Sequence, residues 1–230
     1  MTSANNPARN VLLLLSAVSM VCVLYLVFLY APTDRNLGIS QRIFYFHVSM
    51  AWVGFLAFFW VLVGSVGYLW KRSQRWDRVA YVSAEIGVVF TTLMLITGML
   101  WAKPAWGVWW TWDPKLTTSL ILWLIYVAYL MLRAYSPRGD QGARFAAVLG
   151  IVGFFDIPII YLSVVWWRTV HPPVVIGPVA EGSLEPSMRM VLMACTVAFT
   201  LLYAYLLMDR LSLRQSEEEF ETMQGVAGLA

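Results

Sequence analysis

The most regular feature of the sequence is a series of long apolar stretches separated by short polar links. A helix needs about 20 predominantly apolar residues to cross the hydrocarbon core of a bilayer. Six stretches approach or exceed this length, and each predicts one membrane-spanning helix. They are roughly Val11–Tyr30, Phe44–Trp70, Val79–Trp101, Leu116–Leu132, Phe145–Trp166 and Val191–Met208. The pattern therefore predicts an all-α integral membrane protein, with residues 1–230 forming a single membrane domain.

Composition agrees with this fold class and excludes several functions. The hydrophobic fraction is 60% and the charged fraction 13%, whereas soluble domains are about 45–50% apolar and about 25% charged. The net charge of +3, without a basic stripe, gives no reason to expect nucleic acid as a partner. Cys22 and Cys195 lie in separate apolar stretches, and the sequence has no CxxC, CxxCH or P-loop motif. These absences argue against a thiol relay, a covalent haem carrier and an ATPase.

The orientation follows from the distribution of lysine and arginine. An even number of spans leaves both termini on one side, and the side richer in basic residues is normally cytoplasmic. The richer side carries the termini and the cluster between the second and third spans, Lys71, Arg72, Arg75 and Arg78. We therefore expect both termini inside, with the first span as an uncleaved anchor. Residues 212–230, which include Glu217, Glu218, Glu219 and Glu221, are predicted to form a solvated, acidic cytoplasmic tail.

Both histidines of the chain fall at the outer surface in this topology. His47 opens the second span, and His171 follows the fifth span just before a Pro-Pro pair. Two interfacial histidines without a function are about as plausible from these residues alone. Their shared side of the membrane is nevertheless the first indication of a site.

Tryptophan is concentrated on the same side. Of 12 tryptophans, the outer stretch alone holds Trp101, Trp106, Trp109, Trp110 and Trp112, and Trp166 and Trp167 lie close to His171. Aromatic belts normally occupy both membrane interfaces, yet the inner side has only Trp70 and Trp76. The asymmetry favours an aromatic surface that holds a ligand.

The tryptophan-rich segment, residues 101–117, is predicted to be periplasmic. Two prolines and an aspartate within it indicate where helices end and begin. Pro104 is expected to interrupt the chain after the third span, and Pro114 suits the first position of the fourth span, with Asp113 as its N-cap. If the piece between the prolines is a short helix, Trp106, Trp110 and Asp113 share one face. Gly107 would let a flat ligand approach the backbone closely.

Haem is the flat ligand that these groups suit best. Indole faces supply an apolar wall, and two histidines supply iron ligands. Outer cations can meet the propionates; the candidates are Lys115, Lys103, Arg42 and Arg168.

Two acids lie inside the predicted spans, Glu85 and Asp156. Each costs about 2.5–3.5 kcal/mol to insert, so each is expected to face a partner or a proton path. A structural hydrogen bond is the more favoured role, and Pro158 predicts a kink beside Asp156.

The run WGVWWTWDPKLT, residues 106–117, resembles the tryptophan-rich WWD signature of haem-handling membrane proteins. RIFYFH, residues 42–47, and WWRTVHP, residues 166–172, resemble the two histidine motifs that flank it in the CcmC family. That family is the haem-handling subunit of bacterial cytochrome c maturation, and the resemblance covers nearly the whole chain.

The resemblance implies a non-enzymatic haem-binding and delivery protein of the bacterial inner membrane, with haem b held transiently and without a covalent bond. It implies axial ligation by His47 and His171 and a platform of Trp106, Gly107, Trp110, Trp112 and Asp113. The implied partners are a periplasmic haem chaperone, ABC-type haem exporter subunits and a small single-span membrane protein. The family often has arginine where Lys115 stands, so Lys115 would meet a propionate without the guanidinium fork.

Two other functions remain open at the level of sequence. A b-type cytochrome subunit for electron transfer would normally place its histidines within the bilayer, and neither histidine lies mid-span. A proton-coupled permease for a hydrophobic solute would use the tryptophans as a gate and Glu85 or Asp156 as the proton site.

Overall fold

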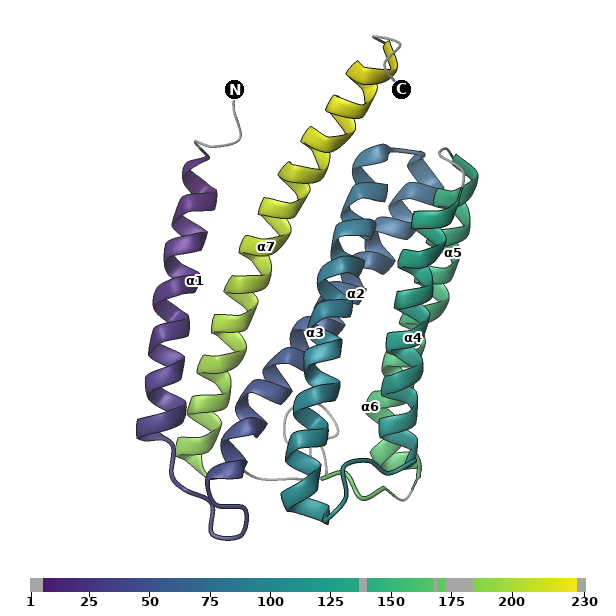
Figure 1. Ribbon diagram of the computed structural model, residues 1–230. Helices are drawn as coiled ribbons and strands as arrows, with labels where there is room; N and C mark the ends of the chain where they lie inside the picture. The colour runs from purple at the N-terminus through teal and green to yellow at the C-terminus, as the bar shows by residue number, and fades with distance from the viewer. Residues whose placement is uncertain (1–5, 137–139, 168, 173–183, 227–230) are drawn as a thin grey trace.

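The computed structural model describes residues 6–136, 140–167, 169–172 and 184–226. These residues form an up-and-down bundle of helices (Figure 1). The main helices are α1 (Pro7–Tyr25), α2 (Arg42–Lys71), α3 (Gln74–Trp106), α4 (Pro114–Tyr135), α5 (Asp140–Phe154), α6 (Asp156–Trp166) and α7 (Pro186–Val226). A π-helical turn, η2 (Leu26–Tyr30), extends α1, and a 3-10 turn, η3 (Ile39–Gln41), precedes α2.

Six helical segments in the described chain are long and apolar enough to cross a membrane, which confirms the predicted fold class. They are Pro7–Tyr30, Ile39–Lys71, Gln74–Trp106, Pro114–Tyr135, Asp140–Trp166 and Pro186–Gln224. Each predicted span lies within one of them. The helices extend past the apolar stretches because polar residues at their ends add turns outside the hydrocarbon.

The two ends of the bundle differ, and we name them for what they carry. α1 begins and α7 ends at the terminal end, where α2 also turns into α3 (Figure 1). The opposite end, which we term the histidine end, carries the start of α2 with His47, the link 107–113 and the segment after α6 with His171. The six-span topology places the two histidines at one end, as the sequence predicts.

Several packed clusters hold α2 in place, and two of them illustrate how. Between α2 and α4, the rings of Phe58 and Tyr126 stack with centroids 3.6 Å apart and planes 4° apart. Between α1, α2 and α7, Val23, Tyr45 and Leu192 are buried in a second cluster. Since α2 belongs to both, the helix that carries His47 is anchored on two sides.

The fifth span is broken, as Pro158 predicts. α5 ends at Phe154 and α6 begins at Asp156. In a continuous helix the Pro158 ring would clash with the carbonyl four residues earlier, which belongs to Phe154. The helix therefore breaks just after Phe154, whose carbonyl cannot form a helical hydrogen bond with Pro158.

The predicted interruption at Pro104 is wrong. α3 continues through Pro104 and ends at Trp106, because a proline in the last turns removes only one helical hydrogen bond. Gly107 ends the helix instead: its φ of 78° is in the left-handed region, which glycine adopts without steric cost. Residues 107–113 are not helical, so the short in-plane helix considered from sequence does not form.

The acidic segment expected as a solvated tail is helical as far as Val226. α7 has 41 residues and is about 60 Å long, roughly twice the thickness of a hydrocarbon core. It projects past the other helices at the terminal end (Figure 1). Residues 227–230 lie outside the described part of the chain.

Candidate functional site

His47 lies near the start of α2 and faces α3 across the helix pair. Its Nδ1 is 3.0 Å from the carbonyl oxygen of Met94 and 3.3 Å from Oγ1 of Thr97. A carbonyl can only accept, so this contact requires the proton on Nδ1 and leaves the lone pair on Nε2. Among the residues that the structure describes, none is hydrogen-bonded to this Nε2. His47 is thus held in the tautomer that ligates a metal through Nε2.

Gly98 makes room for the His47 ring. A Cβ built on Gly98 would lie 3.0 Å from Cε1 and 3.4 Å from Nδ1 of His47. The imidazole therefore packs directly on the α3 backbone, where a larger residue would push it away. Sequence reasoning missed Gly98, Met94 and Thr97, since nothing in the spacing shows which residues of α3 oppose His47.

His171 lies in an irregular segment after α6 and is held by its own neighbourhood. Its Nδ1 is 2.9 Å from the carbonyl oxygen of Pro172, and its backbone N–H donates to Oγ1 of Thr169 at 3.1 Å. The carbonyl again requires the proton on Nδ1 and leaves Nε2 as the ligating atom. Burial lowers the pKa of His171 to about 3, and the charge of Lys115 adds to the decrease. The ring is therefore neutral at physiological pH.

The tryptophans form a partly exposed surface at the same end. The ring of Trp106 lies 6.3 Å from that of His171 and 5.6 Å from that of Trp101, centroid to centroid. Trp110 and Trp112 pair edge to face at 5.8 Å. The Trp112 side chain is 75% exposed, while Trp110 is half-buried and its Nε1 has no hydrogen-bond partner in the described chain. Aromatic area is thus left uncovered beside a histidine.

Asp113 joins the tryptophan-rich link to the histidine segment. Its Oδ1 accepts from the backbone N–H of Leu116 at 3.1 Å, which confirms the predicted N-cap of α4. Its Oδ2 accepts from Oγ1 of Thr169 at 2.9 Å. Thr169 is a further residue that sequence reasoning missed, although it stands only two positions before His171.

The candidate cations are not equivalent. Lys115, in the first turn of α4, acts electrostatically on both His47 and His171. Lys103 donates to the carbonyl oxygen of Gly107 at 2.9 Å and lies over the Trp109 ring. Arg42 lies 6.0 Å from the Phe28 ring on the α1 side. Arg168 falls outside the described residues.

Several polar atoms at this end are buried without a partner in the described chain: Trp110 Nε1, Thr111 Oγ1, Thr117 Oγ1 and Arg42 Nε. An unsatisfied buried donor normally costs about 1–3 kcal/mol, so native structures rarely keep several together. These donors, two neutral imidazoles and exposed indoles fit a flat, iron-bearing ligand with anionic carboxylates. The groups at this end therefore have the chemistry that haem binding requires.

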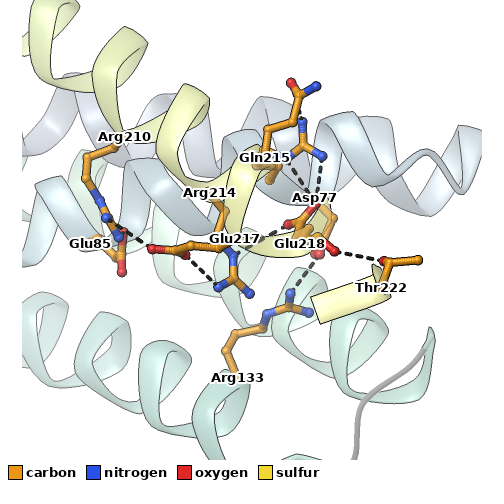
Figure 2. Close-up of polar contacts among 10 residues, drawn as sticks. Asp77, Glu85, Arg133, Arg210, Arg214, Gln215, Glu217, Glu218 and Thr222 are labelled. Atoms are coloured by element: carbon orange, nitrogen blue, oxygen red, sulfur yellow. Dashed lines mark hydrogen bonds and ion pairs between the residues drawn. The ribbon is translucent and has the colours of Figure 1, made fainter. Parts of the chain in front are cut away.

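The two acids in the spans have different environments. Glu85 accepts from Arg210 of α7 at 2.9 Å, so it belongs to an interhelical ion pair (Figure 2). Asp156 is the first residue of α6, and its Oδ2 has no partner among the described residues. Glu85 thus takes the structural role favoured from sequence.

Comparison with known proteins agrees with the motifs at this end. The family model described as "Heme exporter protein C" matches residues 2–225. The chain belongs to the heme exporter protein C family. Three curated proteins of that name are similar to it over most of their length. The one from Bradyrhizobium diazoefficiens is 39% identical over 176 residues, which cover 76% of this chain and 67% of the relative. That from Haemophilus influenzae is 36% identical over 198 residues, covering 83% and 77%. That from Escherichia coli K12 is 37% identical over 184 residues, covering 79% and 73%.

Membership in the heme exporter protein C family confirms the resemblance drawn from the tryptophan-rich run and its flanking histidines. The matched range includes every site residue named above. Together with the six helices, it makes the chain a multi-pass membrane subunit of the heme exporter type.

Proposed function

We propose that this protein binds haem b at the outer face of the bacterial inner membrane and delivers it to a periplasmic haem chaperone during cytochrome c maturation. His47 and His171 would be the axial iron ligands, and the platform would comprise Trp106, Gly107, Trp110, Trp112 and Asp113. Lys115 would meet a propionate. The protein would act in a complex with ABC-type haem exporter subunits and a small single-span membrane partner, and would catalyse no reaction itself.

One observation carries this proposal. Both histidines tie Nδ1 to a backbone carbonyl and leave Nε2 without a partner among the described residues. A histidine that ligates a metal typically donates its other ring N–H in this way, which fixes the tautomer and the ring orientation. Two such rings at one end of a bundle, on different segments, suit two axial ligands of one iron.

The surroundings suit delivery better than permanent storage. Trp109, Trp112, Trp166 and Trp167 expose about half or more of their surface, so a bound porphyrin would keep an accessible edge. Burying an indole face contributes about 25 cal/mol per Å², so a few indoles supply substantial affinity without enclosing the ligand. The position of both histidines at one end argues against a transmembrane electron path. The ion pair of Glu85 argues against its use as a proton site.

The test is the absorption spectrum of the purified, haem-supplied protein. We expect a Soret band with low-spin character, and a change of spin state in both His47→Ala and His171→Ala. Thr118→Val is a suitable control, because the Thr118 hydroxyl bonds only to carbonyls of its own helix. Unchanged spectra in both histidine variants would reject the ligand assignment.

Delivery needs a second measurement. With the chaperone co-expressed, we expect the amount of haem bound to the chaperone to fall several-fold in either histidine variant and to stay normal in Thr118→Val. Normal chaperone loading by a variant that binds no haem would reject delivery by this chain.

A further inference from the structure

The two histidines of the site are supported in different ways. His47 lies on α2, which is packed on both sides, and its ring rests against the α3 backbone. His171 lies in residues 169–172, which have no regular secondary structure and follow the end of α6 at Trp166. We therefore expect local hydrogen bonds to hold His171 in position, as helix packing holds His47.

A short chain of hydrogen bonds runs from α4 to His171. The backbone N–H of Leu116 donates to Oδ1 of Asp113 at 3.1 Å. Oγ1 of Thr169 donates to Oδ2 of the same carboxylate at 2.9 Å and accepts from the backbone N–H of His171 at 3.1 Å. Asp113 is fixed at the N-terminus of α4 by its capping bond, so the chain has one rigid end.

In this chain of hydrogen bonds, the hydroxyl of Thr169 connects Asp113, which is fixed to α4, to the backbone of His171. It must donate and accept at the same time, which a hydroxyl can do and a methyl group cannot. We propose that Thr169 is a positioning residue, which connects the tryptophan-rich link to His171 so that both present one surface to the porphyrin. This inference rests on the proposed function, because it assigns His171 as an iron ligand.

The expected consequence is specific. Without the hydroxyl, residues 169–172 lose this hydrogen-bonded link to α4, while His47, the indoles and the cap of Asp113 keep their contacts. Haem should still bind, but His171 should occupy the iron for a smaller fraction of the time. Two lost hydrogen bonds correspond to a roughly tenfold effect on that occupancy.

The experiment compares Thr169→Val, Thr169→Ser, Thr118→Val and His171→Ala in the full-length protein purified with haem. The readouts are the spin state from absorption and electron paramagnetic resonance, and the rate of haem loss to an excess of a haem-scavenging globin. We expect Thr169→Val to shift toward the His171→Ala spectrum and to lose haem about tenfold faster. Thr169→Ser keeps the bonding hydroxyl and should match the wild type, as should Thr118→Val. A wild-type spectrum and haem-loss rate for Thr169→Val would overturn the proposal.

A double variant separates positioning from a direct contact with haem. In the His171→Ala background, Thr169→Val should change neither the spectrum nor the rate of haem loss further, since the residue on which it acts is gone. An additional loss in that background would overturn the positioning role. Added imidazole should restore the low-spin spectrum in Thr169→Val and in His171→Ala if both fold and leave an axial position free.

The same variants distinguish this inference from the proposed function. If His171→Ala keeps the wild-type spectrum, the ligand assignment fails, and with it the basis of the inference. If His171→Ala changes the spectrum and Thr169→Val does not, the proposed function stands and only the positioning role is rejected. Thermal unfolding of each variant in detergent shows whether a lost spectrum reflects a lost fold, in which case Thr169→Ala, which also lacks the hydroxyl, replaces Thr169→Val.

Discussion

The two ends of the bundle treat their polar groups in opposite ways. At the terminal end, charges are paired across helices: Arg78 with Glu218 at 2.6 Å, Arg133 with Asp77 at 2.7 Å, and Arg210 with Glu85 at 2.9 Å (Figure 2). At the histidine end, buried polar atoms are left without partners, and indoles are left uncovered. Charged groups at the terminal end thus have partners within the protein, whereas polar groups at the histidine end lack partners that a ligand could supply.

The difference shows that one end of this small membrane protein fixes the helices, while the other is available for a ligand. The ion pairs join α7 to α3 and α4 to α3, which fixes the bundle away from the site. Helix association within lipid gains little from apolar contact alone, so such polar links matter for the arrangement of the helices. The histidine end is then free to keep unsatisfied donors, whose cost is offset by a scaffold held elsewhere.

The largest effect is expected from the loss of an ion pair at the terminal end. Glu85→Gln leaves Arg210 without its closest carboxylate, which should lower the free energy of unfolding by about 3 kcal/mol. Thermal unfolding in detergent measures the loss. The double variant Glu85→Gln/Arg210→Gln should recover part of it, because the arginine that lost its closest carboxylate is also removed. Haem affinity of the folded protein should stay unchanged; a specific loss of haem would contradict the separation of the two ends.

The next largest effect is expected at the histidine end, from a substitution of Gly98. In Gly98→Ala the new methyl group meets the His47 ring at 3.0 Å, so the ring must shift away from Met94. We expect this misalignment to weaken haem binding by about 2 kcal/mol, with a change of spin state, because axial ligation depends on ring orientation. Titration with haem measures the affinity. An unchanged spectrum would show that the Gly98 contact does not set the orientation of His47.

A pair of exposed tryptophans sharpens the comparison. Trp112 is 75% exposed at the histidine end, and Trp70 is 82% exposed at the terminal end. Trp112→Ala should weaken haem binding by about 1–2 kcal/mol, the amount expected if a porphyrin covers part of one indole. Trp70→Ala should leave haem binding unaltered. Equal losses in the two variants would mean that tryptophan acts here only as an interfacial anchor.

The smallest effect concerns Lys115. Lys115→Gln removes a positive charge near both imidazoles and should weaken haem binding by about 0.5–1 kcal/mol if the amine meets a propionate at a partly solvated edge. Lys115→Arg keeps the charge and should bind at least as well as the wild type. Comparing haem with its dimethyl ester isolates the carboxylate, and the ester should bind Lys115→Gln and the wild type equally. A preference of the wild type for the ester would contradict the contact.

Much of the fold follows from patterns that the sequence carries locally. The six apolar stretches predict six spans because the bilayer demands about 20 apolar residues per crossing. Asp113 before Pro114 predicts a capped helix start, since an aspartate oxygen reaches the nearby N–H groups of its own chain. Pro158 predicts the break between α5 and α6 for a steric reason that is also local.

One expectation failed where a local signal competes with a neighbouring one, and another left out contacts that only the bundle supplies. Pro104 is a helix breaker in the interior of a helix, but near the end of α3 it is tolerated, and Gly107 decides where the helix stops. The acidic residues near the end of the chain are predicted from sequence only as a solvated tail, which remains a prediction. In the bundle, Glu217 and Glu218 form ion pairs with arginines on α7 itself and on α3, and the helix continues.

The sequence by itself determined the class of protein, the number of spans, the gathering of both histidines and many tryptophans at one end of the bundle, and the family. All of these depend on residue type and on spacing along one chain. Only the tertiary structure decided that Met94 and Gly98 orient His47, that Thr169 connects Asp113 to His171, and that Arg210 neutralises Glu85 from 125 positions away. Such contacts depend on the rotation and depth of each helix against its neighbours. Packing of the whole bundle sets those quantities, and no single segment encodes them.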